Sequence, residues 1–234
     1  MRRLTLTGRE LEGFDPGLPA ASVRLLLPQP GSGAPVIPTW DGNEFLHADG
    51  ARPAIRTLTP LRFDAEQLEL DVEVVLHGDG PLSSWAAAAG PGDHVAVAGT
   101  GRGYEIDPSA PAFLLAGDES ALPAMTMLVA ELPAPAEVHA IVELGDPRAE
   151  VDLPHHPHLS VDWRVADRGG RPGDELVAAV TGRAIDADTR VWVAGEAASV
   201  HRIRRHLFDQ LGLPRSRVVV RGYWKHGRRS DGGE

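Results

Sequence analysis

The sequence predicts two domains, an antiparallel β-domain followed by an α/β domain built on a mostly parallel sheet. Up to about residue 110, short β-type runs are separated by Gly, Pro and Asp, and beyond it strand-like and helix-like runs alternate. The length of 234 residues also suits two units of roughly 100 residues each. We therefore predict domains of residues 1–109 and 110–234.

In the first domain, β-type runs occupy residues 22–28, 54–63, 67–77 and 93–99. The third run alternates Leu70, Val72 and Val74 with acidic residues, which is the period of a half-buried strand. Several such strands at close spacing predict a small antiparallel barrel or sandwich. Residues 30–53 contain too much Pro and Gly for a regular element and are expected to form a surface excursion.

In the second domain, the predicted strands are residues 112–117, 137–144, 159–165, 189–196 and 216–224. The predicted helices between them are residues 121–133, 174–182 and 198–212. This alternation implies a mostly parallel sheet with helices on both faces.

Composition excludes several classes of function. The chain has no cysteine, which rules out disulfides, thiolate nucleophiles and cysteine-held zinc or iron–sulfur centres, so any electron transfer would use an organic cofactor. A net charge of −10 argues against nucleic-acid binding. No apolar run approaches the roughly 20 residues of a membrane span, and the N-terminus lacks a signal-peptide core, so a cytoplasmic protein without membrane insertion is expected.

Two segments of the second domain combine a strand end with a helix start. The segment GDES supplies Gly117, Asp118, Glu119 and Ser120, and the segment VAGE supplies Gly195 and Glu196. Ligands of parallel sheets bind beyond the carboxyl ends of the strands, where helix N-termini present N–H groups. Taken singly, each segment is also explained by a turn and a helix cap.

The first domain offers a similar junction. GPLSSW is predicted to start a helix that runs to Ala89, and Gly80, Ser83 and the first N–H groups would suit a pyrophosphate. Arg56 and Thr59 lie on one predicted strand, where a guanidinium and a hydroxyl could grip phosphate and a ring edge. A plain N-cap and an exposed edge-strand charge are the simpler alternatives.

Positive charge gathers at the C-terminus, where Lys225 is the only lysine of the chain. Arg221, Arg228 and Arg229 lie beside it, so the segment is either a solvated tail or a docking site for an anion. The histidine-rich segment HHPH at residues 155–158 is interpreted as a solvated connection in preference to a metal site.

The order of these segments resembles the siderophore-interacting protein family, the ferric-siderophore reductases of the ferredoxin-reductase superfamily, over nearly the whole chain. The resemblance is carried by RTLTPLRFD (56–64), VLHGDGPLSSWA (75–86), PGDHVAVAGTGRG (91–103), GDESALPAM (117–125), VWVAGEAASVHRIRRHL (191–207) and RGYWKHG (221–227). It implies a six-stranded antiparallel FAD-binding β-barrel followed by a nicotinamide-nucleotide-binding α/β domain.

Residue by residue, the resemblance implies that Arg56 lies near the FAD pyrophosphate and Thr59 near the flavin ring. Gly80 and Ser83 match a second motif, whose helix start would cradle the diphosphate, and His77 would line the same cofactor. In the second domain, residues 117–123 and 194–196 would lie on two sides of the nicotinamide nucleotide.

The chain departs from the family pattern at two positions. Leu58 stands where the family usually has Tyr, and Leu61, just before Arg62, stands where it usually has Arg. Leu58 would give the flavin ring apolar cover without stacking, at a loss of about 1 kcal/mol. A missing phosphate-pairing Arg would weaken FAD by a further ~1.5–3 kcal/mol. Both Leu58 and Arg62 are kept as cofactor-binding candidates.

The implied activity is reduction of ferric siderophores by NADPH or NADH through FAD, with reduced ferredoxin as an alternative donor. Lys225, Arg228 and Trp224 are the expected binding residues for the ferric siderophore. Asp146 and Arg148 leave the choice between NADH and NADPH open. A non-catalytic siderophore- or flavin-binding protein, and a general NAD(P)H:flavin or quinone reductase, are the two alternative functions.

Overall fold

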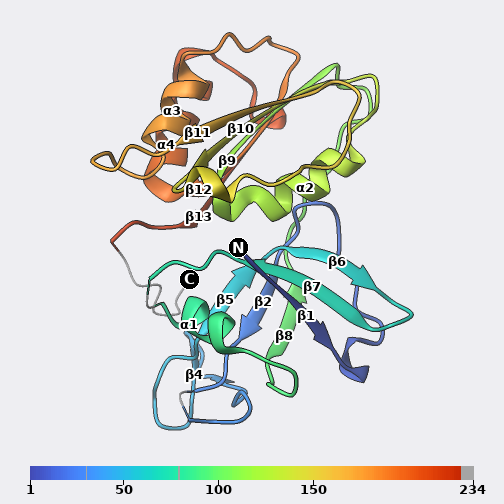
Figure 1. Cartoon of the computed structure of the whole chain (residues 1–234), viewed down its shortest axis with the longest axis vertical. Coiled ribbons are helices and arrows are strands. Elements are labelled where there is room, and N and C mark those ends of the chain that lie inside the picture. The colour runs from blue at the N-terminus through green and yellow to red at the C-terminus, as the bar shows by residue number, and fades with distance from the viewer. Residues whose placement is uncertain (30, 79, 228–234) are drawn as a thin grey trace. The chain divides into compact units, whose positions relative to one another are not determined.

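The computed structural model describes residues 1–29, 31–78 and 80–227 and contains two compact units (Figure 1). The first unit is Met1–Tyr104, and the second begins at Glu105. Both this limit and the predicted one after residue 109 fall in the loop that connects the last strand of the first unit with the first strand of the second.

The described part of the first unit is an antiparallel β-structure with six main strands, a short hairpin, one α-helix and a 3-10 turn at Arg9–Leu11. The elements are β1 (Arg2–Thr7), β2 (Val23–Leu26), β3 (Thr39–Trp40), β4 (Phe45–Leu46), β5 (Ile55–Leu58), β6 (Pro60–Asp64), β7 (Glu69–Val74), α1 (Pro81–Ala88) and β8 (Ala96–Thr100). Hydrogen bonds join the main strands into two three-stranded sheets, ordered β1-β7-β6 and β5-β2-β8. The predicted antiparallel domain is confirmed, and the excursion at residues 30–53 contains the hairpin β3–β4.

The predicted strand over residues 54–63 is in fact two strands in different sheets. The chain leaves β5 after Leu58 and enters β6 at Pro60, so the buried Thr59 lies between them in neither strand. Proline has no N–H to donate to a ladder, which favours a break at this point. The expectation that Arg56 and Thr59 share one strand is therefore wrong.

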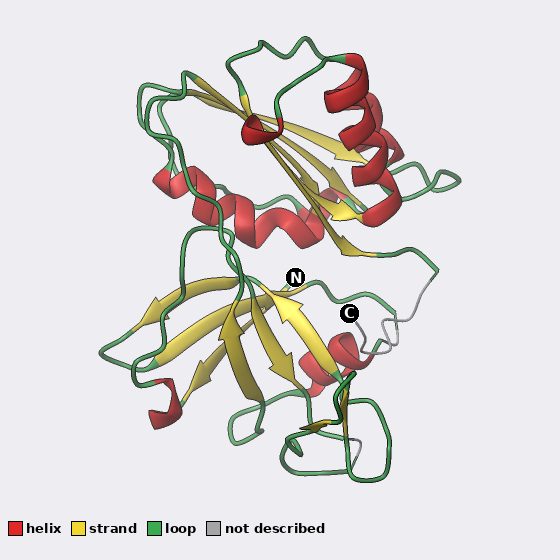
Figure 2. Cartoon of the chain, turned by 180° about the vertical axis from the view of Figure 1, so that it is seen from behind, coloured by secondary structure: helices red, strands yellow, loops and turns green. Residues whose placement is uncertain are grey.

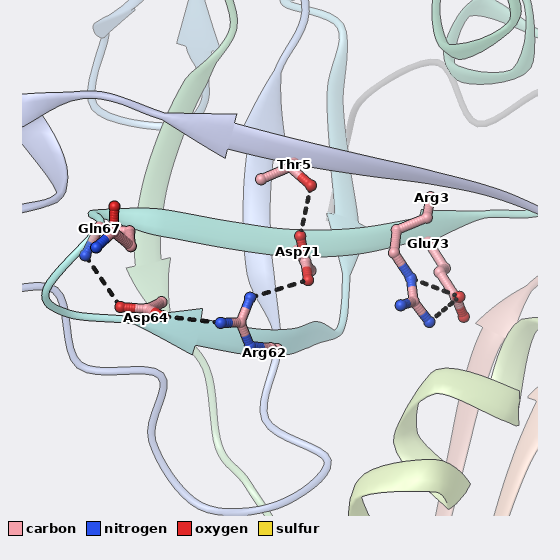
Figure 3. A network of polar contacts seen from close by, with 7 residues as sticks. All are labelled: Arg3, Thr5, Arg62, Asp64, Gln67, Asp71 and Glu73. Carbon is pink, nitrogen blue, oxygen red and sulfur yellow. Dashed lines mark hydrogen bonds and ion pairs between the residues drawn. The ribbon is translucent and has the colours of Figure 1, made fainter.

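Strand β7 separates the apolar interior of the first unit from a polar outer surface. Leu70, Val72 and Val74 are buried. On the other side of the strand, Thr5 donates to the buried Asp71 at 2.6 Å (Figure 3). Arg62 forms ion pairs with Asp71 and with a second carboxylate at the end of its own strand.

The second unit is a five-stranded parallel sheet with helices on both faces, as predicted (Figures 1 and 2). Its elements are β9 (Ala112–Asp118), α2 (Leu122–Glu131), β10 (Glu137–Leu144), β11 (Leu159–Val165), α3 (Asp174–Thr181), β12 (Arg190–Glu196), α4 (Ala197–Arg205), a π-helical turn (His206–Gln210) and β13 (Val218–Trp224). Helix α2 covers one face, and α3 and α4 cover the other.

The strand order reverses next to β9, and the name crevice is used for the carboxyl ends of β9 and β12 together with the turns that follow them. The order is β11-β10-β9-β12-β13, so the chain moves outward from β9 and then returns to the opposite side of β9 for β12. Ligands of open parallel sheets bind at such a reversal, beyond the carboxyl ends of the two strands. Gly117 of β9 pairs with Ala194 of β12, which brings GDES and VAGE to the two sides of the reversal.

A buried carboxylate ties α3 to the sheet. Glu143, at the end of β10, accepts hydrogen bonds from the N–H groups of Gly173 and, at 2.8 Å, Leu176. Burial raises the pKa of the Glu143 carboxyl, although the two N–H donors favour its ionised form.

The ion pair between Asp107 and Arg190 is expected to stabilise the second unit only above acid pH. The guanidinium of Arg190, followed by Ser109, lowers the pKa of Asp107 from 3.8 to about 2. Its contribution is therefore present above the unfolded pKa and is lost as the pH falls towards the folded value. We expect Asp107→Asn to lower the Tm by about 1–3 °C at pH 7 and to have a much smaller effect near pH 2, where about half of the carboxyl groups are protonated. Thermal unfolding at several pH values checks this, and a Tm difference independent of pH would contradict it.

Candidate functional site

Helix α1 of the first unit begins without a side-chain cap. Its N-cap residue is Gly80, which has no side chain to accept an N–H of the first turn, and Pro81 is the first helical residue. Among the described residues, a Cβ built on Gly80 would meet no atom within 4 Å, so there is room for a side chain at this cap position. The N–H groups and partial positive charge of an uncapped helix start favour an anion such as a diphosphate.

Ser83 organises the turn that leads into α1. Its hydroxyl is buried and accepts the N–H of His77 at 2.9 Å. A hydroxyl that accepts one hydrogen bond can still donate its own proton, and the His77 side chain is exposed. The two residues that sequence motifs place at the cofactor are therefore joined to each other.

The remaining candidates of the first unit occupy different environments. Arg56 is half-buried and donates to the carbonyl of Ile55 at 2.7 Å. Leu58 is half-buried and packs against the apolar core of the unit. The exposed Arg62 is engaged by the carboxylates of Asp64 and Asp71, so a structural role accounts for it. The assignment of these residues to a cofactor stays a prediction.

In the second unit, the carboxylate of Asp118, at the end of β9, accepts four hydrogen bonds. One oxygen accepts the N–H and the hydroxyl of Ser120. The other accepts the N–H of Glu196 at 2.9 Å and the indole N–H of Trp224 at 2.8 Å. Burial raises the pKa of Asp118, opposed by the hydrogen bonds from Ser120, Trp224 and Glu196.

Glu196 acts as the second cap of the crevice. Its carboxylate accepts the N–H of Ser199, in the first turn of α4, at 2.9 Å and the N–H of His226 at 3.1 Å. Burial alone would raise the pKa of Glu196, but its N–H donors outweigh that effect and the pKa is lowered.

A third acid, Glu119, accepts the N–H of Gly145 at 2.8 Å and so links the end of β9 to the end of β10. The helix caps considered in the sequence analysis are therefore present: Asp118 caps the turn of GDES, and Glu196 of VAGE caps α4. Unlike α1, these junctions already have carboxylate acceptors for their N–H groups.

The two glycines of the crevice are required for close packing. A Cβ on Gly117 would lie 2.4 Å from the Cβ of Ala121 and 2.8 Å from the carbonyl oxygen of Ala194. Gly195 has a φ of 148°, and a Cβ there would lie 2.5 Å from a carboxylate oxygen of Asp118. Gly195 thus makes room for the Asp118 side chain.

The expected siderophore-binding residues lie only partly within the described chain. Trp224 and Lys225 are exposed at the end of β13. Arg228 lies outside the described residues. Sequence reasoning missed Glu143 and the indole bond of Trp224. A lone acid at the end of an apolar strand was the available signal for Glu143, whereas nothing in the sequence pairs residue 224 with residue 118.

The sequence matches two protein-family descriptions that together span most of the chain. Residues 1–103 match the Siderophore-interacting FAD-binding domain, and residues 110–227 match the Siderophore-interacting protein family. The chain belongs to the siderophore-interacting protein family.

Relatives of this siderophore-interacting protein extend over nearly its full length. The crystal structure of a siderophore utilization protein from T. fusca superimposes on this chain with a TM-score of 0.82 and 34% sequence identity. The matched region covers 97% of this chain and 87% of the T. fusca chain. The ferric vibriobactin reductase ViuB of Vibrio cholerae is 27% identical over 98% of this chain and 85% of its own length. The NADPH-dependent ferric-chelate reductase of Escherichia coli is 30% identical over 95% of this chain and 86% of its own length.

Two further observations concern metals and membranes. Within residues 1–29, 31–78 and 80–227, no three His, Asp or Glu side chains gather as a metal site. His156 of the HHPH segment is buried beside the carbonyl of Pro133, at 3.2 Å. No helix in the same ranges is both long and apolar enough to span a bilayer.

Gly117 of this siderophore-interacting protein is expected to tolerate no side chain. Gly117→Ala should destabilise the fold by about 1–3 kcal/mol, because the new methyl group meets a backbone carbonyl and a helix residue. The matched control is Gly145→Ala, whose Cβ would come no closer than 3.6 Å to a flexible carboxylate and should cost less than about 0.5 kcal/mol. Urea unfolding compares the two variants, and equal midpoints would contradict the packing argument.

Proposed function

We propose that this protein is a ferric-siderophore reductase, which passes electrons from NADPH or NADH through FAD to siderophore-bound Fe(III) and releases Fe(II). One observation carries the proposal: the match to a FAD-binding domain covers the unit whose α-helix, the one α-helix among its described residues, begins without a side-chain cap. The names of the ferric-reductase relatives, at 27% and 30% identity, support the same activity.

The residues of the first unit fit FAD in chemical type. The N–H groups that follow Gly80, together with the Ser83 hydroxyl, would hold the diphosphate, and Arg56 would add a positive charge. Leu58 and Thr59 would face the flavin ring, with His77 at the same cofactor. When bound, FAD accepts a hydride from a nicotinamide and can give electrons up singly.

The crevice of the second unit would receive the electron donor. The backbone N–H groups there already donate to the carboxylates of Asp118, Glu119 and Glu196. Because carboxylates accept hydrogen bonds and repel anions, this region suits ribose hydroxyls better than phosphate oxygens. Arg148 is held by a bidentate ion pair with Asp146, which lowers the pKa of Asp146 to about 2. A 2′-phosphate would compete with that pair, and reduced ferredoxin is the alternative donor.

Reduction releases iron because the two oxidation states differ in their preference for oxygen ligands. Siderophores hold Fe(III) through hard oxygen donors, and Fe(II) suits these donors less well. The exposed ammonium of Lys225 would attract an anionic ferric siderophore, and the exposed indole of Trp224 would offer apolar contact. No protein nucleophile or protein metal ligand is needed.

A single spectroscopic experiment tests the proposal. Purified protein receives FAD, then NADH or NADPH without oxygen, and finally a ferric tris-catecholate or a ferric hydroxamate. The proposal expects a protein-bound flavin spectrum, its bleaching by one of the donors, and recovery when the ferric complex is added. Bound flavin that is not reoxidised by either ferric complex would refute the reductase function.

Leu58, which replaces the usual Tyr of the flavin motif, packs against the apolar core of the first unit. Two alternative functions are therefore tested by the same experiment. Failure to acquire bound FAD would favour a non-catalytic siderophore-binding protein. Faster turnover with free flavin or a quinone than with ferric siderophores would favour a general reductase.

Lys225→Ala is expected to raise the KM for a ferric tris-catecholate by about 10- to 100-fold, because a charged contact contributes ~1.5–3 kcal/mol. NAD(P)H oxidation with a small neutral quinone as the acceptor should change little. Arg9→Ala removes an exposed positive charge of the first unit and is the matched control. Equal effects of Lys225→Ala on both acceptors would contradict the docking role.

A further inference from the structure

The end of β13 contains an extra residue in its pairing with β12. In its pairing with β12, Gly222 lies opposite Gly195 and Trp224 lies opposite Glu196, so Tyr223 is the additional residue of a bulge. Bulges re-aim the side chains that follow them. This bulge brings Trp224 level with the carboxylate-rich crevice.

On one side of Lys225, the chain is fixed through a side chain. The indole N–H of Trp224 donates to Asp118 at 2.8 Å, although the Trp224 ring is 38% exposed. The same Asp118 oxygen accepts the N–H of Glu196, the residue that Trp224 faces across the two strands. A carboxylate with these partners has little freedom to move, because four donors determine its orientation.

On the other side of Lys225, the chain is fixed through the backbone. The N–H of His226 donates to Glu196 at 3.1 Å, while the second oxygen of Glu196 holds the first turn of α4. The residues before and after Lys225 are therefore bound to two carboxylates that are themselves connected. Lys225 itself is exposed between these two attachments.

We propose that Asp118 and Glu196 are positioning residues that hold the segment Tyr223–His226, and with it the ammonium of Lys225, in place for the ferric siderophore. This inference rests on the proposed function for the role of Lys225. The Lys225 side chain is flexible and loses entropy when an anion binds. Because the backbone on both sides of Lys225 is already fixed, binding does not also have to order the backbone, and the total entropy lost is smaller. Asp118 and Glu196, which the sequence assigns to the donor nucleotide, would thus also position residues 223–226.

A kinetic double-mutant cycle tests whether the anchor acts through Lys225. Trp224→Phe keeps an aromatic ring and removes the N–H donor. It should raise the KM for a ferric tris-catecholate about 3- to 10-fold in the wild-type background and less than about 2-fold in the Lys225→Ala background. Trp40→Phe, at an exposed indole of the first unit, is the matched control and should leave this KM unchanged.

An equal rise in KM in both backgrounds would overturn the positioning role, because the indole would then act independently of Lys225. Wild-type protein that binds FAD but reduces no ferric siderophore would overturn the proposed function, and the role of the anchor with it.

A second measurement tests the anchor without reference to activity. The chain has five tryptophans, and the indole ¹H–¹⁵N resonance that disappears in Trp224→Phe identifies residue 224. That resonance should shift and exchange faster with water in Asp118→Asn, while the resonance of Trp40, which belongs to the other unit, stays in place. An unchanged Trp224 signal in a folded Asp118→Asn variant, with folding checked by thermal unfolding, would overturn the anchor even if the enzyme is active.

Discussion

The first turn of every helix carries N–H groups that need an acceptor, and the two units meet this requirement in opposite ways. In the second unit, the helix starts around the crevice are served by the carboxylates of Asp118, Glu196 and Glu143. In the first unit, Gly80 leaves the start of α1 without a side-chain acceptor. A buried or half-buried N–H without a partner is costly, so the uncapped start is where an external anion gains most.

This difference separates the roles proposed for the two units. An uncapped helix start suits the diphosphate of FAD, whereas a crevice filled with carboxylates suits hydroxyl and amide donors. The same carboxylates reach the end of β13 and fix the residues on both sides of Lys225. One set of acids thus shapes the expected donor site and positions the expected acceptor-binding cation.

The sequence predicted the layout of the fold more fully than the contacts of the site. Alternating apolar residues identified β7, and the change from Gly/Pro-rich strands to strand–helix repeats identified the parallel sheet. The break at Thr59 was missed because residues 54–63 have a continuous β-type composition, although Pro60 signalled it. The bond from Trp224 to Asp118 joins residues 106 positions apart and depends on a bulge that no local pattern reveals. Local propensity therefore located the strands and turns that carry the candidate residues, but it could not say which of these residues bind each other.

The most direct test of this account is the dissociation constant for FAD of three proteins that differ only at position 80. Gly80 has ordinary extended dihedral angles, and a Cβ there would meet no atom of the described residues within 4 Å, so Asp and Asn can both replace it without strain. Either residue would cap α1, but only Asp adds a negative charge where the diphosphate is expected. We predict that Gly80→Asp binds FAD at least about 10-fold more weakly than Gly80→Asn, with equal or higher thermal stability than wild type. The same FAD affinity in all three proteins would contradict the assignment of the α1 start to the cofactor.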